Sequence, residues 1–160
     1  MVVLAGAGAA AAIDLRSRRI PNAVTVPLAL AGLGLSVVGI GDVTLGSALV
    51  GVGLGLLLML PGYAIGATGA GDLKLLAAMG ALLGARQVLV AFIYTAIAGG
   101  LLAVAFAIRR QRLTGTLWRA ASLVAAPAST GAAIKAEGAA NRFPYGPAIA
   151  AGCALAALGI

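Results

Sequence analysis

The chain has 160 residues, of which 62% are hydrophobic, 9% are charged and 24 residues are glycine. This composition excludes an ordinary soluble domain, and abundant glycine with alanine is what close helix packing in lipid uses. In a soluble protein the net charge of +7 would suggest a nucleic-acid partner. Here the basic residues stand at the ends of apolar runs, which indicates membrane topology and contact with lipid headgroups, and no nucleic acid.

The residue types that the chain lacks exclude several kinds of catalysis. Histidine is absent, which excludes Ser-His-Asp and Cys-His catalysis, HExxH zinc hydrolysis and a histidine-held haem. The single cysteine, Cys153, excludes an internal disulfide and a multi-cysteine zinc site. The four acids therefore carry most of the remaining chemistry, and we expect no metal and no organic cofactor.

Six apolar runs predict an all-α, polytopic membrane helix bundle with about six transmembrane helices, in a single domain at 1–160. The first run, 1–13, covers roughly 20 Å as a helix, against a hydrocarbon core of about 30 Å. It resembles a signal-peptide core but lacks a preceding basic region. The runs 23–38 and 45–63 follow, separated by a tight loop. Glycines at 51, 53 and 55 predict a smooth face for a neighbouring helix.

The second half of the chain continues with the runs 73–85 and 87–108, divided at Arg86. A mixed segment, about 109–142, is predicted to be a cytoplasmic surface loop or an interfacial helix. The last, short run is 148–160. If the N-terminus lies outside, nearly all basic residues fall on the cytoplasmic side, which predicts this orientation for a multi-pass protein.

Two acids stand in comparable settings beside an apolar run. Asp14 follows the first run, and Asp72 follows the glycine turn of Gly69 and Gly71. The predicted topology places both on the cytoplasmic side, where the charge of one carboxylate would raise the proton affinity of the other. Plainer interpretations are a helix N-cap for Asp72 and an i,i+4 pair with Arg18 for Asp14.

Other polar residues receive structural interpretations. Asp42 and Glu137 are predicted to be solvated, and Tyr145 to anchor the membrane interface. Lys74 is expected to snorkel to the interface or to balance Asp72. A Ser-Lys peptidase dyad would need a serine near Lys74 in the chain, and there is none.

Three motifs stand in one order along the chain. They are Asp14 with Arg18-Arg19-Ile20-Pro21-Asn22 and Thr25, then Gly69-Ala70-Gly71-Asp72-Leu73-Lys74, then Pro144-Tyr145-Gly146-Pro147-Ala148. From about residue 10 to residue 152, the chain resembles the type IV prepilin leader peptidases, which are Gly-x-Gly-Asp aspartic proteases of bacterial membranes. The resemblance implies two catalytic residues, Asp14 and Asp72, and a supporting set of Gly69, Gly71, Lys74, Pro21 and Asn22.

The resemblance also implies a reaction and its partners. Family members cut the basic leader from prepilins at the cytoplasmic face of the inner membrane, so the partners would be a prepilin, with its apolar helix, and membrane lipid. Larger members carry a domain with paired Cys-x-x-Cys motifs and methylate the new N-terminus. This chain looks like the short Flp/Tad-type branch without that domain. Two other functions stay open, a small proton- or ion-coupled carrier and a non-catalytic assembly factor for a pilus or secretion machine.

The lengths of the runs predict the depth of the two aspartates. Residues 1–14 and 72–86 each rise about 20 Å as helix, so both carboxylates would lie about 10 Å beneath the inner boundary of the core. Helix termini favour negative charge on Asp72 at an N-terminus and protonation of Asp14 near a C-terminus. We therefore expect Asp72 to act as the base and Asp14 as the acid. Nearby arginines oppose this order, and such a pair titrates jointly.

Overall fold

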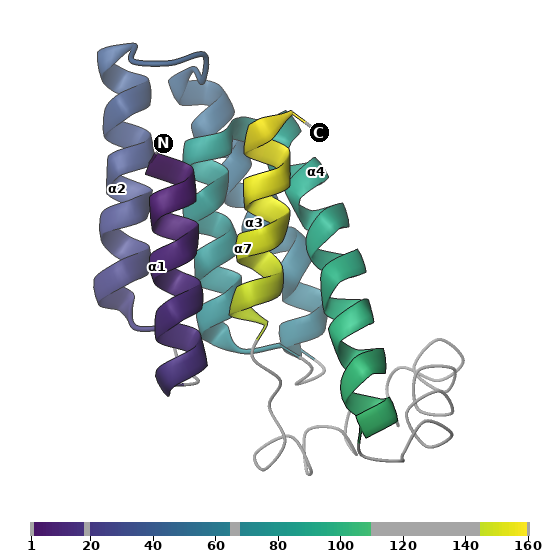
Figure 1. The fold of residues 1–160 in the computed structure, drawn as a ribbon. Helices are drawn as coiled ribbons and strands as arrows, with labels where there is room; N and C mark the ends of the chain where they lie inside the picture. The colour runs from purple at the N-terminus through teal and green to yellow at the C-terminus, as the bar shows by residue number, and fades with distance from the viewer. Residues whose placement is uncertain (1, 18–19, 65–67, 110–144, 160) are drawn as a thin grey trace.

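The structure is a computed structural model that describes residues 2–17, 20–64, 68–109 and 145–159 (Figure 1). The helices within these ranges are α1 (Val2–Ser17), α2 (Asn22–Val38), α3 (Leu45–Ala64), α4 (Ala70–Arg109) and α7 (Gly146–Leu158). The described part of the chain contains no strand, so the all-α prediction is confirmed. The mixed segment predicted at about 109–142 lies, apart from residue 109, outside these ranges.

The helix boundaries lie close to the predicted ones. α1 continues beyond residue 13, so Asp14 lies within its last turns and does not follow the helix. α2 ends at Val38 as predicted, because Gly39 adopts the left-handed conformation, with φ 74°. There the backbone N–H groups of Gly39 and Ile40 donate hydrogen bonds to the carbonyl oxygen of Leu35, in the last turn of the helix.

α4 consists of two helical parts that meet at Gly84. This residue has φ 77° and ψ 176°, which interrupts the helix between residues 70–83 and residues 85–109. Glycine adopts such a positive φ without the steric cost of a Cβ. The N–H of Ala85, freed by the break, donates a hydrogen bond to Ser47 Oγ at 3.0 Å. In Figure 1 the first part of α4 lies inside the bundle and the second part lies along its edge.

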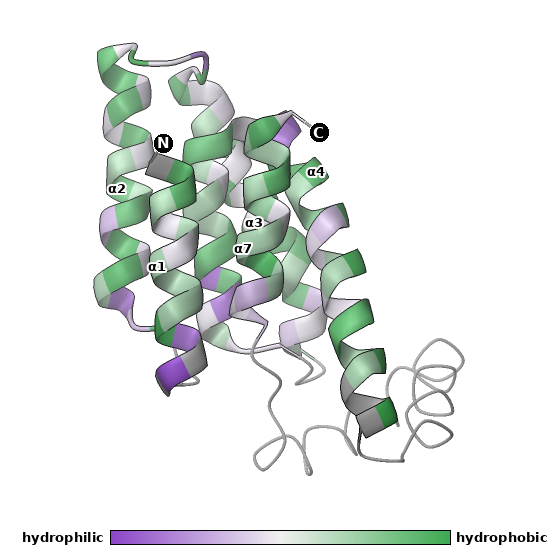
Figure 2. Cartoon of the chain, in the orientation of Figure 1, coloured by the Kyte–Doolittle hydropathy of each residue, from purple (hydrophilic) through white to green (hydrophobic). Residues whose placement is uncertain are grey.

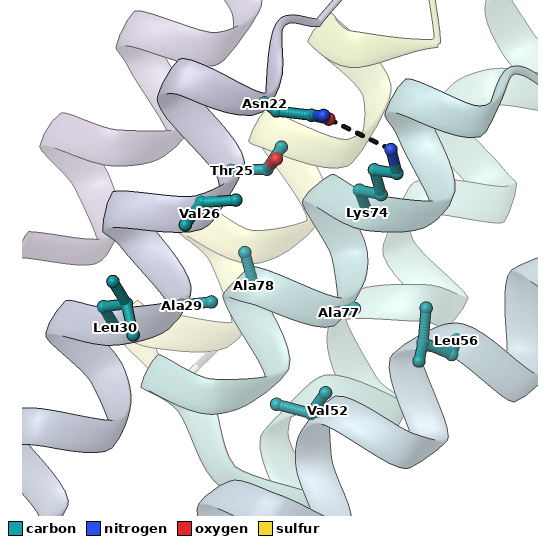
Figure 3. Close-up of a pocket in the computed structure, with 10 residues that line it drawn as sticks. All are labelled: Asn22, Thr25, Val26, Ala29, Leu30, Val52, Leu56, Lys74, Ala77 and Ala78. Carbon is teal, nitrogen blue, oxygen red and sulfur yellow. Dashed lines mark hydrogen bonds between the residues drawn. The ribbon is translucent and has the colours of Figure 1, made fainter.

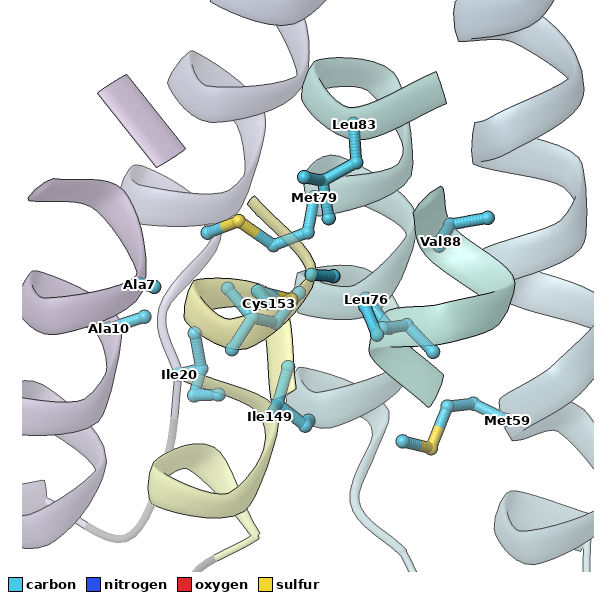
Figure 4. Packing of buried hydrophobic residues seen from close by; sticks show 13 residues of the cluster. Ala7, Ala10, Ile20, Met59, Leu76, Met79, Leu83, Val88, Ile149 and Cys153 are labelled. Atoms are coloured by element: carbon cyan, nitrogen blue, oxygen red, sulfur yellow. The ribbon is translucent and has the colours of Figure 1, made fainter. Parts of the chain in front are cut away.

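The first part of α4 forms the centre of the bundle. Residues 75–81 are buried without interruption, which requires neighbours on every side of this helix. α2, α3 and α7 all pack on α4. Figure 4 shows Leu76 and Met79 of α4 in one cluster with Ile149 and Cys153 of α7. Cys153 is fully buried and packs within this cluster.

The outer faces of the helices are apolar. Large hydrophobic side chains such as Leu30, Leu57 and Ile97 are more than half exposed. In Figure 2 hydrophobic residues cover these outward faces, and hydrophilic residues gather where α1 ends and α2 and α7 begin. An apolar surface of this extent indicates contact with lipid, in which helices satisfy their own backbone groups. The chain is therefore a membrane-associated helical protein.

Within the described residues, two helices are long and apolar enough to cross a membrane. They are Leu45–Ala64, with 20 residues, and the helix Ala70–Ala105, with 36 residues, which contains the break at Gly84. The apolar helices Val3–Asp14, Asn22–Val38 and Gly146–Leu158 are shorter. At about 1.5 Å per residue, these helices are shorter than a core of about 30 Å, so a span by any of them requires a locally thinner bilayer. The number of six spans stays a prediction.

Glycines allow α3 to lie directly against α4. Gly51 faces the backbone of Gly80, and a Cβ added at Gly55 would lie 2.7 Å from the carbonyl oxygen of Leu76. Gly53, by contrast, faces open space. The smooth helix face predicted from these glycines is therefore formed by Gly51 and Gly55, as is usual where helices approach closely in membranes.

The contrast between these glycines gives a stability test. We expect Gly51→Ala to lower the free energy of unfolding by about 1–3 kcal/mol, because the new methyl group must displace the backbone of Gly80. Gly53→Ala should be neutral, or stabilising by up to about 1 kcal/mol, because alanine is the better helix former and meets nothing there. Thermal unfolding in detergent measures both, and equal effects would contradict the close α3–α4 contact.

Candidate functional site

The carboxylate of Asp14 is held at the start of the last helix. Asp14 is 4% exposed, and its Oδ2 accepts a hydrogen bond of 2.9 Å from the N–H of Gly146, the first residue of α7. A Cβ added at Gly146 would lie 2.6 Å from the same oxygen. Position 146 therefore admits the Asp14 carboxylate because it carries no side chain, and the first and last helices meet at this contact.

The carboxylate of Asp72 turns back onto the glycine motif that precedes it. Asp72 is 8% exposed and lies in the first turn of α4, where its Oδ2 accepts a hydrogen bond of 3.0 Å from the N–H of Gly69. This is the second half of a capping box, in which the third residue of a helix bonds the N–H that precedes the helix. Asp72 does cap the helix, but from inside it, and the interpretation as the N-cap residue is wrong.

Tyr145 connects the surroundings of the two aspartates. Asp14 bonds the N–H of Gly146, the next residue, and the charge of Asp72 acts on the phenol of Tyr145. Burial, and then the Asp72 carboxylate, raise the pKa of Tyr145 above its ordinary value of 10.0. The ring lies against Gly99 in the second part of α4. The structure thus brings both predicted acids to the start of α7.

The remaining predicted site residues lie between α2 and α4. A Cβ added at Gly71 would come within 3.2 Å of the backbone nitrogen of Ile20, so the segment before α2 packs tightly on the start of α4. Pro21 is the N-cap of α2, with φ −72°. Asn22 Oδ1 accepts a hydrogen bond of 3.0 Å from Lys74 Nζ. Gly69 therefore lies against the Asp72 carboxylate and Gly71 against Ile20. Lys74 links α4 to α2 through its hydrogen bond to Asn22.

The other polar candidates do not join this site. Asp42 is exposed in the turn between α2 and α3, as predicted. Arg18, the proposed partner of Asp14, and Glu137 lie outside the described residues. Among the residues that the structure describes, no three histidine, cysteine, aspartate or glutamate side chains are grouped as a metal site would require.

Sequence reasoning did not assign a site role to Tyr145 or Gly146. Both belong to the motif 144–148, which stands far from the two aspartates in the chain. The Gly146 donor is a backbone group, so no side chain at that position signals its function. The order of the three motifs was the one available signal that this segment belongs with Asp14 and Asp72.

Comparison with known proteins identifies a family. The profile of the type IV leader peptidase family matches residues 1–104, a range that contains Asp14, Asp72 and all five supporting residues. No match was found among curated proteins or among solved structures. The family match covers more than half of the chain and describes a peptidase, which is a hydrolase.

The raised pKa of Tyr145 predicts a loss of stability in alkali. A group whose pKa is raised by folding contributes stability that is complete below its unfolded pKa, here about 10, and is lost as the pH rises through the folded pKa. We therefore expect wild type to lose stability relative to Tyr145→Phe as the pH rises above about 10, because only wild type must then bury a phenolate near Asp72. Thermal unfolding of both proteins in detergent across this range measures the difference, and parallel curves would contradict the assignment.

Proposed function

Because the chain belongs to the type IV leader peptidase family, we propose that it is an aspartic endopeptidase that removes the basic leader from a prepilin of the Flp/Tad type. The family implies a peptidase with a prepilin-type substrate. The aspartic mechanism is supported by one observation above all. Asp14 and Asp72 are the buried acids of the described bundle, and their interactions reach two consecutive residues, Tyr145 and Gly146.

The reaction that we propose is the hydrolysis of one peptide bond by water. In this scheme one of the two carboxyl groups is ionised and acts as the base, and the other is protonated and acts as the acid. The ionised carboxylate takes a proton from water while the water oxygen attacks the scissile carbonyl carbon. The protonated carboxyl group polarises the carbonyl oxygen, and the carboxyl group that took the proton from water donates it to the leaving nitrogen as the C–N bond breaks. No metal or organic cofactor takes part in this scheme.

The contact with Gly146 changes the predicted division of roles. The sequence places Asp72 at a helix N-terminus and Asp14 near a helix C-terminus, which predicted Asp72 as the base and Asp14 as the acid. Asp14, however, also bonds the first N–H of α7, and a helix N-terminus favours negative charge. Helix ends therefore favour negative charge on both residues and do not distinguish base from acid, so we propose the two carboxyl groups as a catalytic pair without separately assigned roles.

We propose a six-span topology for the single domain, residues 1–160, in the bacterial inner membrane. The break at Gly84 supports counting the two parts of α4 as separate spans. Hydrophilic residues gather at the end of the bundle that holds the two aspartates, and the exposed Arg16 lies there, which supports a cytoplasmic site. The basic leader of the substrate would stay on that side by the same rule.

The dyad is tested by removing one ionisable group at a time. Asp14→Asn and Asp72→Asn should each lower the rate of leader removal by about 10²–10⁴-fold, the usual contribution of general acid–base catalysis. Asp42→Asn, in the exposed turn, should cleave at the wild-type rate. Co-expression with a candidate prepilin, followed by mass spectrometry for loss of the leader, measures all three. Processing of the prepilin by Asp72→Asn at nearly the wild-type rate would contradict the aspartic mechanism.

The contact between Asp14 and Gly146 gives a separate test of positioning. Gly146→Ala should displace the carboxylate and lower the cleavage rate by about 10²-fold, which is the cost of a misplacement of about 1 Å. Gly34→Ala, on α2, meets nothing within 4 Å and should leave the rate unchanged. Thermal unfolding of each variant separates an effect on the site from an effect on the fold. A Gly146→Ala protein with wild-type activity would show that this contact does not position Asp14.

A further inference from the structure

A cavity of about 280 Å³ lies between α2, α3 and α4, separate from the contacts of the two aspartates (Figure 3). Asn22 and Lys74 close one end with their hydrogen bond, and alanines 77 and 78 of α4 form part of its lining. Leu30 of α2 and Leu56 of α3 stand on its sides and are partly exposed on the outer surface of the bundle. The cavity is therefore a groove that opens toward lipid.

Thr25, in the wall of this groove, has a buried hydroxyl for which the described part of the chain supplies no hydrogen-bond partner. The side chain is 3% exposed, and among the described residues its Oγ1 has no hydrogen-bond partner. Figure 3 shows the hydroxyl directed from α2 into the space before α4. A buried hydroxyl without a partner is unfavourable, so this wall fits a ligand that brings a hydrogen-bonding group.

The shape and chemistry of the groove favour an apolar helix over a lipid chain. Small residues on two sides, Ala29 of α2 and Ala77 and Ala78 of α4, let another backbone approach closely. Threonine hydroxyls form hydrogen bonds across membrane helices, where the partner supplies a carbonyl or a polar side chain. An acyl chain has no such group along its length and would leave Thr25 unsatisfied.

The groove reaches the level of the candidate catalytic site on the other side of the same helix. Lys74 follows Asp72 by two positions, which turns it by about 200° around α4. Asp72 accordingly bonds Gly69, whereas Lys74 bonds Asn22 at the closed end of the groove. A helix in the groove could thus be joined to a peptide bond at the aspartates by an extended segment that passes the start of α4.

We propose that this groove binds the apolar helix of the prepilin, with Thr25 bonded to that helix. The inference rests on the proposed peptidase function and adds the place where the substrate is held.

Cysteine crosslinking tests the occupant directly. The probe is a synthetic precursor with a basic leader, an apolar helix of about 20 residues and one cysteine within that helix. In a Cys153→Ala background, which removes the one native cysteine, we expect disulfides from Leu30→Cys and Leu56→Cys. Leu57→Cys is the matched control, because Leu57 is the next residue of α3, is 64% exposed and does not line the groove. Equal crosslinking at 56 and 57, or none at 30 and 56, would overturn the proposal.

The cleavage kinetics of the same precursor test whether the Thr25 hydroxyl contributes to substrate binding. Thr25→Val keeps the shape of the side chain and should raise KM about threefold with kcat unchanged, as expected for one average hydrogen bond between membrane helices. Thr25→Ser keeps the hydroxyl and should retain the wild-type KM. A fall in kcat alone, or equal behaviour of the two variants, would contradict binding by Thr25. If the wild type left the probe uncut, the peptidase assignment would fail, and the crosslinks would still decide whether the groove binds an apolar helix.

Discussion

The site depends on the cost of placing carboxylates inside an apolar bundle. A charged group in such surroundings requires hydrogen-bond donors, and the described donors to Asp14 and Asp72 are both backbone N–H groups. A helix N-terminus provides donors that no helical carbonyl uses, at α7 for Asp14 and at α4 for Asp72. Because the bond from Gly146 to Asp14 tolerates little displacement, it fixes the end of α1 against the start of α7, whereas the bond from Gly69 to Asp72 holds the start of α4 to itself. Glycine at position 146 is what lets the Asp14 oxygen approach the start of α7, since a Cβ there would lie 2.6 Å from that oxygen.

Much of the fold could be predicted because each helix is a separate apolar run with a glycine or basic stop. That Asp14 and Asp72 share the cytoplasmic side, as the basic residues suggest, stays a prediction. The sequence placed the division of α4 at Arg86, two residues beyond the break at Gly84, because Arg86 carries a charge and a glycine within an apolar run gives no such signal. Likewise, the glycine pattern indicated a smooth face on α3, but only the rotation of the helix distinguishes Gly51 from Gly53.

Neither the backbone donors to the two aspartates nor the groove could be predicted, because both depend on how the helices pack. Every residue except proline has a backbone N–H, so the role of the Gly146 N–H follows only from its position in the folded chain. The unsatisfied hydroxyl of Thr25 likewise becomes visible only when α2, α3 and α4 are packed. Within the first turn of α4, residues two positions apart face different neighbours. Asp72 and Lys74 therefore belong to different surroundings although they stand in one short motif.

The bond between Asp14 and Gly146 joins residues that are 132 positions apart. During synthesis, α1 leaves the ribosome long before the segment that supplies its donor. Until α7 is inserted, the Asp14 carboxyl group lacks that donor and has to be hydrated or protonated to stay beside lipid. The environment of the acid pair is therefore completed only when the last described helix enters the bundle. A nascent chain, whose own apolar segments are still being inserted, does not yet hold the assembled site.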